Sequence, residues 1–262
     1  MFLDKIAMAS TGNIHVHTEN RATWITLDRP PLNVLDISMM HALSGELRNV
    51  ITASDFIVFQ GAGPKGFSAG VEVRDHTPER VGEMLSTFHG VFRQLWRADC
   101  ITIAAVHGYC FGGGCELATF CDFVIATESA QFAQPEVKLG CYPPVALVTF
   151  PSLIGMRAAM DLILTGRTVS AREAQQLGLV TRVAPDDGLA TTVDALLGEL
   201  RALSPAVLRM IRRELWRDAG LEFEKLLDRA EELYLNELMK MEDTTEGLRA
   251  FMEKRAPVWK GR

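Results

Sequence analysis

The sequence predicts an α/β fold that is followed by a region made only of helices. Before about Pro185, a buried strand, a glycine-containing loop and a helix recur in that order from residues 56, 101 and 123. After Pro185 the apolar residues follow a helical period over residues 189–203, 206–216 and 222–241, with no further convincing strand. We therefore predict a core of residues 1–185 and a helical C-terminal subdomain of residues 186–262.

The first elements of the core are a predicted hairpin and a helix. Apolar and polar residues alternate over residues 14–17 and 23–27, on either side of a short polar turn. Arg29-Pro30-Pro31 ends the second strand. Ser38 is the expected N-cap of a helix that runs to about Val50.

The following strands lead into the loops that carry the polar residues. Residues 56–59 are continuously apolar and precede a glycine-rich loop over residues 61–70. A helix is expected to start at Thr77-Pro78, because proline is favoured at the first helical position. Residues 101–106 form the next buried strand and lead into three glycines. Such loops at strand ends are where functional residues concentrate.

Composition excludes several classes of function. The net charge of −6 and the absence of a basic stripe argue against general nucleic-acid binding. Five cysteines without a C-x-x-C pair predict reduced thiols, and the six histidines lack ligand spacing, so we expect no metal. The N-terminus lacks the pattern of a signal or transit peptide, and no apolar run approaches ~18 residues. We therefore expect a cytoplasmic protein with no membrane segment.

Three consecutive glycines, Gly112 to Gly114, stand directly before a predicted helix. Their uncovered N–H groups at a helix N-terminus favour an anion, and beside an oxygen that becomes an enolate they form an oxyanion hole. Glu116 follows two residues after the last glycine, and Glu136 follows twenty residues later, after a proline. Two nearby carboxyls can share proton transfers at the adjacent carbon. These residues predict acyl chemistry through a stabilised enolate.

A set of motifs in fixed order resembles the enoyl-CoA hydratase/isomerase (crotonase) superfamily, from about Ile14 to the C-terminus. The motifs are Phe67-Ser68-Ala69-Gly70, Gly112-Gly113-Gly114-Cys115-Glu116-Leu117, Cys121-Asp122, Phe132 to Glu136, Leu164-Thr165-Gly166 and Ala174 to Val180. The resemblance implies a ββα spiral core and C-terminal helices that assemble trimers or pairs of trimers. It also implies an acyl-CoA thioester substrate, with no cofactor beyond the coenzyme A that is part of the substrate.

The resemblance carries over individual roles. It implies that Glu116 and Glu136 are catalytic and that the N–H groups of Ala69 and Gly113 form the oxyanion hole. The adenine of coenzyme A is expected between the segment Leu32-Asn33-Val34 and the loop residues Ala69, Val71 and Val73. Lys254 is expected to reach a phosphate, with a solvated lysine as the alternative. Carboxyls at both positions favour hydration. The alternative functions are those of an isomerase of the same superfamily and of a non-catalytic acyl-CoA-binding protein.

A hydrolase is the rival prediction, because Gly66 to Gly70 spells the G-x-S-x-G pattern of a nucleophile elbow. An elbow needs a strand that runs directly into the serine and a helix directly after it. Here the segment from Gly61 to Gly66 lies between the predicted strand and Ser68, and the next helix is expected only near Pro78. No histidine follows His107. The sequence therefore favours a structural role for Ser68.

The segment after Glu136 departs from the family pattern. Flexible glycines are typical there, but this chain has Tyr142, Pro143, Pro144 and Val145. Proline fixes φ, so this wall of the acyl pocket is expected to be stiff and crowded and to favour a compact acyl group. This wall, the segment from residue 32 to 36 and the loop from residue 68 to 73 resemble hydratases of cyclohexa-1,5-diene-1-carbonyl-CoA, enzymes of aromatic compound degradation.

The late helices predict an oligomer. Apolar residues lie on more than one face of them, and a helix that is apolar beyond one stripe needs a second surface to bury against. The residues are Leu226, Leu227, Leu233, Leu235, Leu238 and Met239. We expect a homotrimer or a dimer of trimers.

Overall fold

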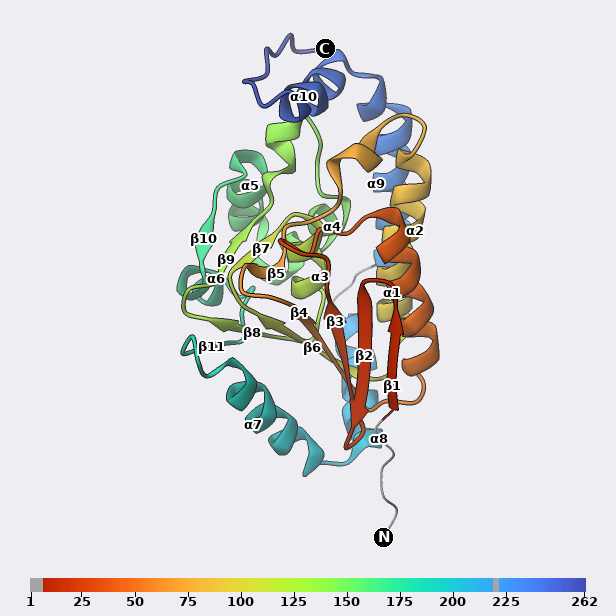
Figure 1. Cartoon of the computed structure of the whole chain (residues 1–262), viewed down its shortest axis with the longest axis vertical. Coiled ribbons are helices and arrows are strands. Elements are labelled where there is room, and N and C mark those ends of the chain that lie inside the picture. Colours follow the sequence, from red (N-terminus) through yellow and green to blue (C-terminus); the bar gives the residue numbers. More distant parts are fainter. Residues whose placement is uncertain (1–6, 219–221) are drawn as a thin grey trace.

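Two β-sheets surrounded by helices form the core of the computed structural model, which describes residues 7–218 and 222–262 (Figure 1). The larger sheet has the order β1 (Ala7–Thr11), β2 (Ile14–Glu19), β3 (Ala22–Leu27), β4 (Phe56–Gly61), β6 (Ile101–Val106), β8 (Phe123–Thr127) and β11 (Arg182–Ala184). Its β3, β4, β6, β8 and β11 are parallel neighbours. The smaller sheet has the order β10 (Val169–Ser170), β9 (Gln131–Ala133), β7 (Tyr109–Phe111) and β5 (Gly66–Ser68).

Each predicted strand–loop–helix repeat adds one strand to each sheet and then a helix. The three repeats are β4–β5 with α2 (Val81–Arg97), β6–β7 with α3 (Gly113–Thr119), and β8–β9 with α4 (Pro144–Ile154). The loops of all three repeats therefore meet where the smaller sheet ends. The remaining helices of the core are α1 (Ile37–Val50), α5 (Met156–Thr165) and α6 (Ala171–Leu177), with 3₁₀ turns η1 (Val73–His76) and η2 (Pro135–Leu139).

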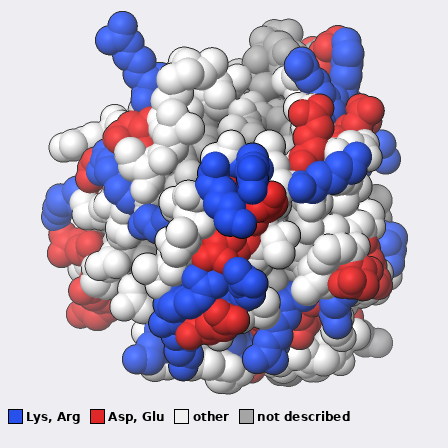
Figure 2. Space-filling model, turned by 90° about the horizontal axis from the view of Figure 1, so that it is seen from above, with Lys and Arg blue, Asp and Glu red and all other residues white. Residues whose placement is uncertain are grey.

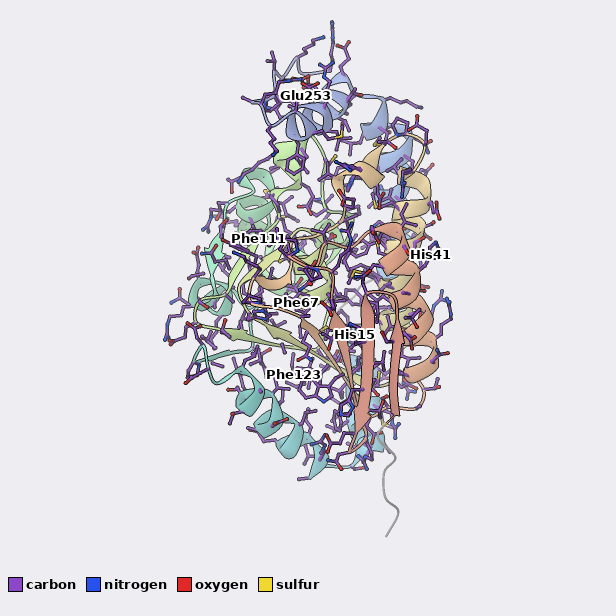
Figure 3. The ribbon with its side chains drawn as sticks, viewed as in Figure 1. His15, His41, Phe67, Phe111, Phe123 and Glu253 are labelled. Atoms are coloured by element: carbon purple, nitrogen blue, oxygen red, sulfur yellow. The ribbon has the colours of Figure 1, made fainter. Side chains whose placement is uncertain are left out.

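Alternation along the central strands separates two apolar layers. In β4, Ile57 and Phe59 pack with the layer that includes α1 and α2. Phe56 and Val58 point to the other face and pack against α7 (Leu189–Arg201). All four side chains are buried, as expected for a strand covered on both faces. Figure 3 shows Phe67 of β5 near the centre of the molecule and His41 of α1 at its periphery.

The predicted elements are confirmed with corrected boundaries. The hairpin pairs Ile14 with Leu27, as predicted. The N-cap of α1 is Asp36, whose Oδ1 accepts the N–H of Met39 at 2.8 Å, so the assignment to Ser38 is wrong. α2 begins at Val81, because the residues after Thr77 first form a turn that closes on the Thr77 carbonyl. β1 was not predicted, because Ala7 to Thr11 lacks alternation and large β-formers.

After β11 the described residues form only helices. These are α7, α8 (Pro205–Asp218), α9 (Phe223–Asn236), η3 (Leu238–Lys240) and α10 (Glu242–Met252). The predicted helix of residues 222–241 ends earlier than expected, and α10 was not predicted. α9 lies against α2 and α4, and α10 lies against η2, so these helices cover the core of the same chain (Figure 1). No helix in the described segments is long and apolar enough to cross a bilayer.

Candidate active site

A cavity of about 360 Å³ lies where the loops of the three repeats meet. Its walls come from the loop after β5, the start of α3, η2, the segment before α4, and parts of α2, α9 and α10. This volume lies in the range of small-molecule sites. The cavity brings together most of the residues predicted from the sequence: Ala69, Val71, Val73, Gly113, Glu116, Glu136, Tyr142, Pro143 and Pro144.

The start of α3 supplies a free backbone donor. Gly113 is the first residue of this helix, and its N–H has no hydrogen-bond partner within residues 7–218 and 222–262. A Cβ at Gly113 would lie 2.7 Å from Val71 Cγ2 and 2.9 Å from Phe88 Cζ, so only glycine fits. The Cα of Gly113 therefore packs against Val71 and Phe88, and no side chain of residue 113 covers its N–H group.

The prediction that the Ala69 N–H is the second free donor is wrong. The Ala69 N–H donates to the Leu32 carbonyl at 2.9 Å and is not available to a ligand. The N–H of Val71, two residues later, has no partner in the described part of the chain, although the neighbouring Leu35 N–H donates to the Gly70 carbonyl. Both Val71 and Gly113 line the cavity. The structure thus offers Val71 and Gly113, not Ala69 and Gly113, as a pair of adjacent free donors.

Glu116 lies in the first turn of α3 and is only 3% exposed. Its Oε1 accepts the N–H of Ala146 at 2.9 Å, at the N-terminus of α4. Burial raises the pKa of Glu116 to about 7, against the opposing effect of the Ala146 and Val145 amides. A carboxyl with this pKa exchanges protons readily at neutral pH.

Glu136 lies in η2 and lines the same cavity, with its carboxyl next to Gly112, the N-cap residue of α3. Its Oε1 would lie 2.6 Å from a Cβ on Gly112, whose φ of 51° and ψ of −129° also favour glycine. Burial, and then the nearby Glu116 carboxylate, raise the pKa of Glu136 well above its usual value. The amide of Gln134, turned so that its nitrogen faces inward, lies 3.3 Å from Glu136 Oε2. Both carboxyls therefore have raised pKa values, and the charge of Glu116 favours the protonated form of Glu136.

The predicted pocket wall is present but shorter than expected. Tyr142, Pro143 and Pro144 line the cavity, and the Tyr142 hydroxyl donates to the Ala230 carbonyl of α9 at 2.7 Å. Val145 does not line the cavity, because its side chain is fully buried in the core. Its contribution is the backbone amide beside Glu116.

The segment Leu32-Asn33-Val34 supports the cavity without lining it. Asn33 is buried, and its Nδ2 donates to the carbonyls of Ala62 and Gly66 at 2.9 and 3.0 Å. Leu32 accepts the Ala69 N–H. In this structure the segment therefore shapes the loop that carries Val71.

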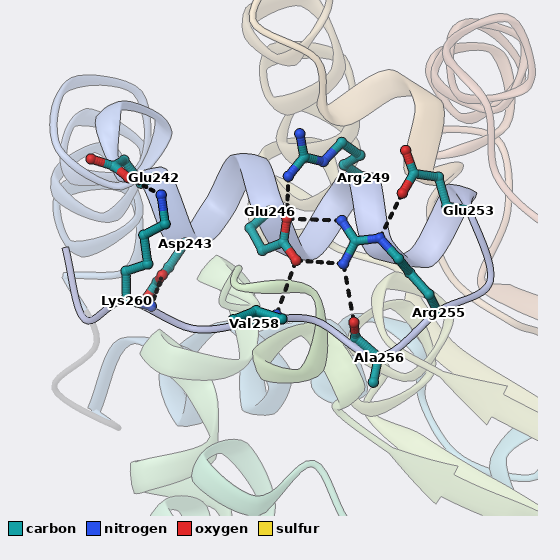
Figure 4. Close-up of polar contacts among 9 residues, drawn as sticks. All are labelled: Glu242, Asp243, Glu246, Arg249, Glu253, Arg255, Ala256, Val258 and Lys260. Carbon is teal, nitrogen blue, oxygen red and sulfur yellow. Dashed lines mark hydrogen bonds and ion pairs between the residues drawn. The ribbon is translucent and has the colours of Figure 1, made fainter.

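The C-terminal tail folds back along α10 and brings a different cation to the cavity from the one predicted. Arg255 lines the cavity and Lys254 does not. Arg255 forms a two-point contact with Glu246, with Nη1–Oε1 at 2.6 Å and Nη2–Oε2 at 2.9 Å (Figure 4). Glu246 also accepts the Val258 N–H at 2.9 Å, which ties the tail to α10. Figure 2, which views this end of the molecule, shows Lys and Arg side chains next to Asp and Glu.

The hydrolase alternative has no support at Ser68. The side chain is fully buried, its hydroxyl donates to the Asn33 carbonyl at 2.7 Å, and it accepts the Gly70 N–H at 3.2 Å. His107 contacts the Gly63 carbonyl through Nε2 at 2.8 Å. Ser68 and His107 both hold backbone segments in place, and for Ser68 the sequence predicted this role. The described residues contain no cluster of three or more His, Cys, Asp or Glu side chains that could hold a metal ion.

Sequence reasoning missed His89 and Tyr234, which also line the cavity. His89 lies on α2 and Tyr234 on α9, and both are at least 99% buried. A single histidine or tyrosine on an amphipathic helix carries no spacing signal, since its position is typical of a core residue. Only the packing of α9 on α2 places them beside the loops that carry Glu116 and Glu136.

Comparison with known proteins agrees with this geometry. The family model for enoyl-CoA hydratase/isomerase matches residues 17–262. The chain is similar to a cyclohexa-1,5-dienecarbonyl-CoA hydratase of Thauera aromatica, with 33% identity over 91% of this chain and 92% of that protein. It is 36% identical to a probable enoyl-CoA hydratase of Mycobacterium bovis, over 93% and 96% of the two chains.

A solved structure confirms the fold class. An enoyl-CoA hydratase from Mycobacterium avium subsp. paratuberculosis superposes with a TM-score of 0.87 at 25% identity, over 96% of this chain and all of that one. The predicted α/β, crotonase-like fold with C-terminal helices is therefore correct.

Proposed function

The chain belongs to the enoyl-CoA hydratase/isomerase family, and we propose that it is a hydratase that adds water to an α,β-unsaturated CoA thioester. The observation that carries this proposal is the pair of carboxyls, Glu116 buried and Glu136 half-buried, in one cavity with two free backbone N–H groups. A binding protein has no need for two acids with raised pKa values, because burying them costs stability.

In the proposed reaction the thioester oxygen accepts hydrogen bonds from the N–H groups of Val71 and Gly113. Charge builds up on this oxygen as the enolate forms, so fixed donors stabilise the transition state more than the substrate. Each donor is expected to lower the barrier by ~3 kcal/mol. The helix α3, which begins at Gly113, adds the favourable end of its dipole.

The two carboxyls divide the proton transfers. Glu116, with a pKa of about 7, orients and deprotonates the water that attacks the electron-poor carbon. Glu136, whose pKa is raised further by the Glu116 charge, holds the proton that is delivered to the α-carbon. Two acids whose environments separate their pKa values provide a base and an acid at the same pH. On a conjugated diene we propose that the hydroxyl adds at the far end.

The acyl group is proposed to be compact, with a cyclic dienoyl thioester as the leading candidate. The wall of Tyr142, Pro143 and Pro144 is fixed by two prolines and by the Tyr142–Ala230 hydrogen bond. The Tyr142 ring also packs against Tyr234 with centroids 5.0 Å apart. A stiff wall favours a rigid ligand over a long mobile chain. The relative from Thauera aromatica, whose name specifies a cyclic dienoyl substrate, supports the same choice.

We further propose that the protein works as a homotrimer or a dimer of trimers in the cytoplasm, without a metal or redox cofactor. Leu226 and Leu233 of α9 are each 38% exposed, and Met210, Ile211 and Leu215 of α8 are exposed by half or more. Exposed apolar side chains in such numbers mark an interaction surface. All five cysteines are free and buried, which suits a reducing compartment.

The test is a substrate panel of crotonyl-CoA, decenoyl-CoA and cyclohexa-1,5-diene-1-carbonyl-CoA, followed by loss of conjugated-thioester absorbance. The expected result is hydration, fastest on the cyclic substrate. Equal or faster turnover of decenoyl-CoA would reject the cyclic assignment and leave a general hydratase. Double-bond migration without water uptake would identify an isomerase, and tight binding without turnover of any substrate would identify an acyl-CoA-binding protein.

A further inference from the structure

His89 lines the cavity and has one ring nitrogen, Nε2, that is not used in a hydrogen bond within the described residues. The side chain is fully buried, and its Nε2 has no hydrogen-bond partner in the described part of the chain. A buried polar atom without a partner costs ~1–3 kcal/mol, so a retained one calls for a ligand or a role. The reaction proposed above uses the carboxyls and the backbone donors and leaves this atom without a function.

The other ring nitrogen determines what Nε2 can do. His89 Nδ1 lies 2.6 Å from Glu231 Oε1 on α9. Glu231 also contacts Arg93 at 2.9 Å, and Arg93 contacts Asp228 at 2.6 Å. Burial opposes the charge of Glu231, but the hydrogen bonds from His89 and Arg93 hold its pKa below the usual value. Because an ionised carboxylate only accepts, Nδ1 carries a hydrogen and donates it to Glu231.

With Nδ1 as the donor to Glu231, Nε2 is the acceptor of the neutral imidazole, which is the form that burial favours. Burial lowers the pKa of His89, despite the opposing effect of Glu231. In a neutral imidazole one nitrogen donates and the other accepts. The Nδ1 edge faces Glu231, so the Nε2 edge lies on the other side of the ring, and His89 is part of the cavity wall. The complement of such an atom is an O–H group on the occupant of the cavity.

One side chain, Phe88, lies between His89 and the start of α3. Phe88 separates the two sites: its Cζ lies 2.9 Å from a Cβ placed on Gly113, and its ring centroid lies 5.9 Å from that of His89. The apolar side chains of Val73, Met84 and Leu85 line the cavity with His89, and so do the polar side chains of His76 and Tyr234. Of the polar side-chain atoms of His76, His89 and Tyr234, the His89 Nε2 is the one that is buried without a hydrogen-bond partner in the described part of the chain.

We propose that His89 Nε2 accepts a hydrogen bond from a hydroxyl group on the acyl part of the ligand, so that the pocket selects hydroxyacyl-CoA thioesters over their deoxy counterparts. The proposal rests on the proposed function only in placing an acyl-CoA thioester in this cavity. Arg93 and Glu231 act as positioning residues that keep the imidazole in the accepting tautomer. A site built to bind a substrate hydroxyl discriminates strongly against an analogue that lacks it.

Calorimetry with saturated thioesters tests recognition separately from turnover. The probes are 4-hydroxybutyryl-, 5-hydroxyvaleryl- and 6-hydroxyhexanoyl-CoA, each against its deoxy counterpart. The wild-type protein should bind at least one hydroxylated probe roughly 5- to 150-fold more tightly than its counterpart. Equal affinity at all three lengths would overturn the proposal.

Two variants separate the acceptor from the structural role of the ring. In His89→Asn the amide nitrogen can still donate to Glu231, but nothing replaces Nε2, so the preference should fall to about 1-fold while deoxy probes bind as before. In His89→Gln the longer side chain can place an oxygen near the Nε2 position, and part of the preference should return. A preference that survives in His89→Asn, with an unchanged melting temperature, would refute the role of Nε2.

The outcome is distinguishable from failure of the proposed reaction. A hydroxyl preference without hydration of any enoyl-CoA would keep the recognition site and reject the hydratase. Hydration of crotonyl-CoA without a hydroxyl preference would keep the hydratase and reject the recognition site. Absence of binding for every probe would overturn both.

Discussion

Replacing Gly112 by alanine tests the architecture of the acid in the proposed site. The new Cβ would lie 2.6 Å from Glu136 Oε1, well inside van der Waals contact. The obstructing atom is the end of a flexible side chain, so the carboxyl can swing away. The backbone cannot adapt as easily, because φ of 51° with ψ of −129° disfavours any residue with a side chain. We expect a loss of about 1–3 kcal/mol of stability from the backbone.

The loss of activity should be larger than the loss of stability explains. A displaced general acid costs about 10²–10⁴-fold in rate. Hydratase kinetics and urea denaturation of Gly112→Ala measure the two effects separately. Gly198→Ala, in α7, is the matched control, since its Cβ would meet no atom within 4 Å. This control should keep full activity and gain about 0.5–1 kcal/mol.

A double-mutant cycle decides whether Gly112 acts through Glu136. If the alanine only displaces the carboxyl, adding Glu136→Gln to Gly112→Ala should lower kcat little further. Fully additive losses would mean that Gly112 acts through another group. Full activity in Gly112→Ala would refute the assigned position of the acid.

Four further outcomes are expected. Glu136→Gln should lower the hydration rate about 10²–10⁴-fold with little change in thioester affinity, and full activity in this variant would falsify the mechanism. Burial raises the pKa of Glu116 to about 7, so the folded state loses stability as the pH rises from the ordinary carboxyl range through 7. In Glu116→Gln the amide oxygen can still accept the Ala146 N–H. This variant should therefore be up to roughly 3 kcal/mol more stable than the wild type at pH 8 and equally stable at pH 4. Urea denaturation at the two pH values measures this difference. Pro144→Gly should narrow the activity gap between cyclic dienoyl-CoA and decenoyl-CoA, because it loosens the cavity wall. Light scattering at micromolar concentration should give a trimeric or hexameric mass, and a purely monomeric mass would contradict the assembly.

The part of the cavity that holds the two carboxyls was predictable because local rules determine it. The glycines before α3 and the carboxyls at Glu116 and Glu136 lie at strand ends, where a parallel arrangement brings loops together. The position of a donor within one loop was not predictable at this level. Ala69 and Val71 are two residues apart, and only the Leu32 carbonyl, which binds the Ala69 N–H, decides between them.

The substrate half of the cavity depends on contacts between distant segments. His89 and Glu231 are 142 positions apart, and Tyr142 and Ala230 are 88 apart. Periodicity predicts that α2 and α9 each bury one face, but not which residues of the two faces meet. Lys254 and Arg255 show the same limit, since the turn of the tail around Glu246 decides which cation faces the cavity.

These contacts assign chemistry and selectivity to different parts of the chain. The carboxyls and the free N–H groups come from the repeats of the core, whereas α9 holds His89 through Glu231, anchors Tyr142 through Ala230 and adds Tyr234. A substitution on α9 can therefore move the acyl wall without touching the reacting atoms. Because α9 also exposes Leu226 and Leu233, a neighbouring subunit packed on that face would restrain the same helix. Changes at this surface should thus alter which acyl group is accepted before they alter the type of reaction.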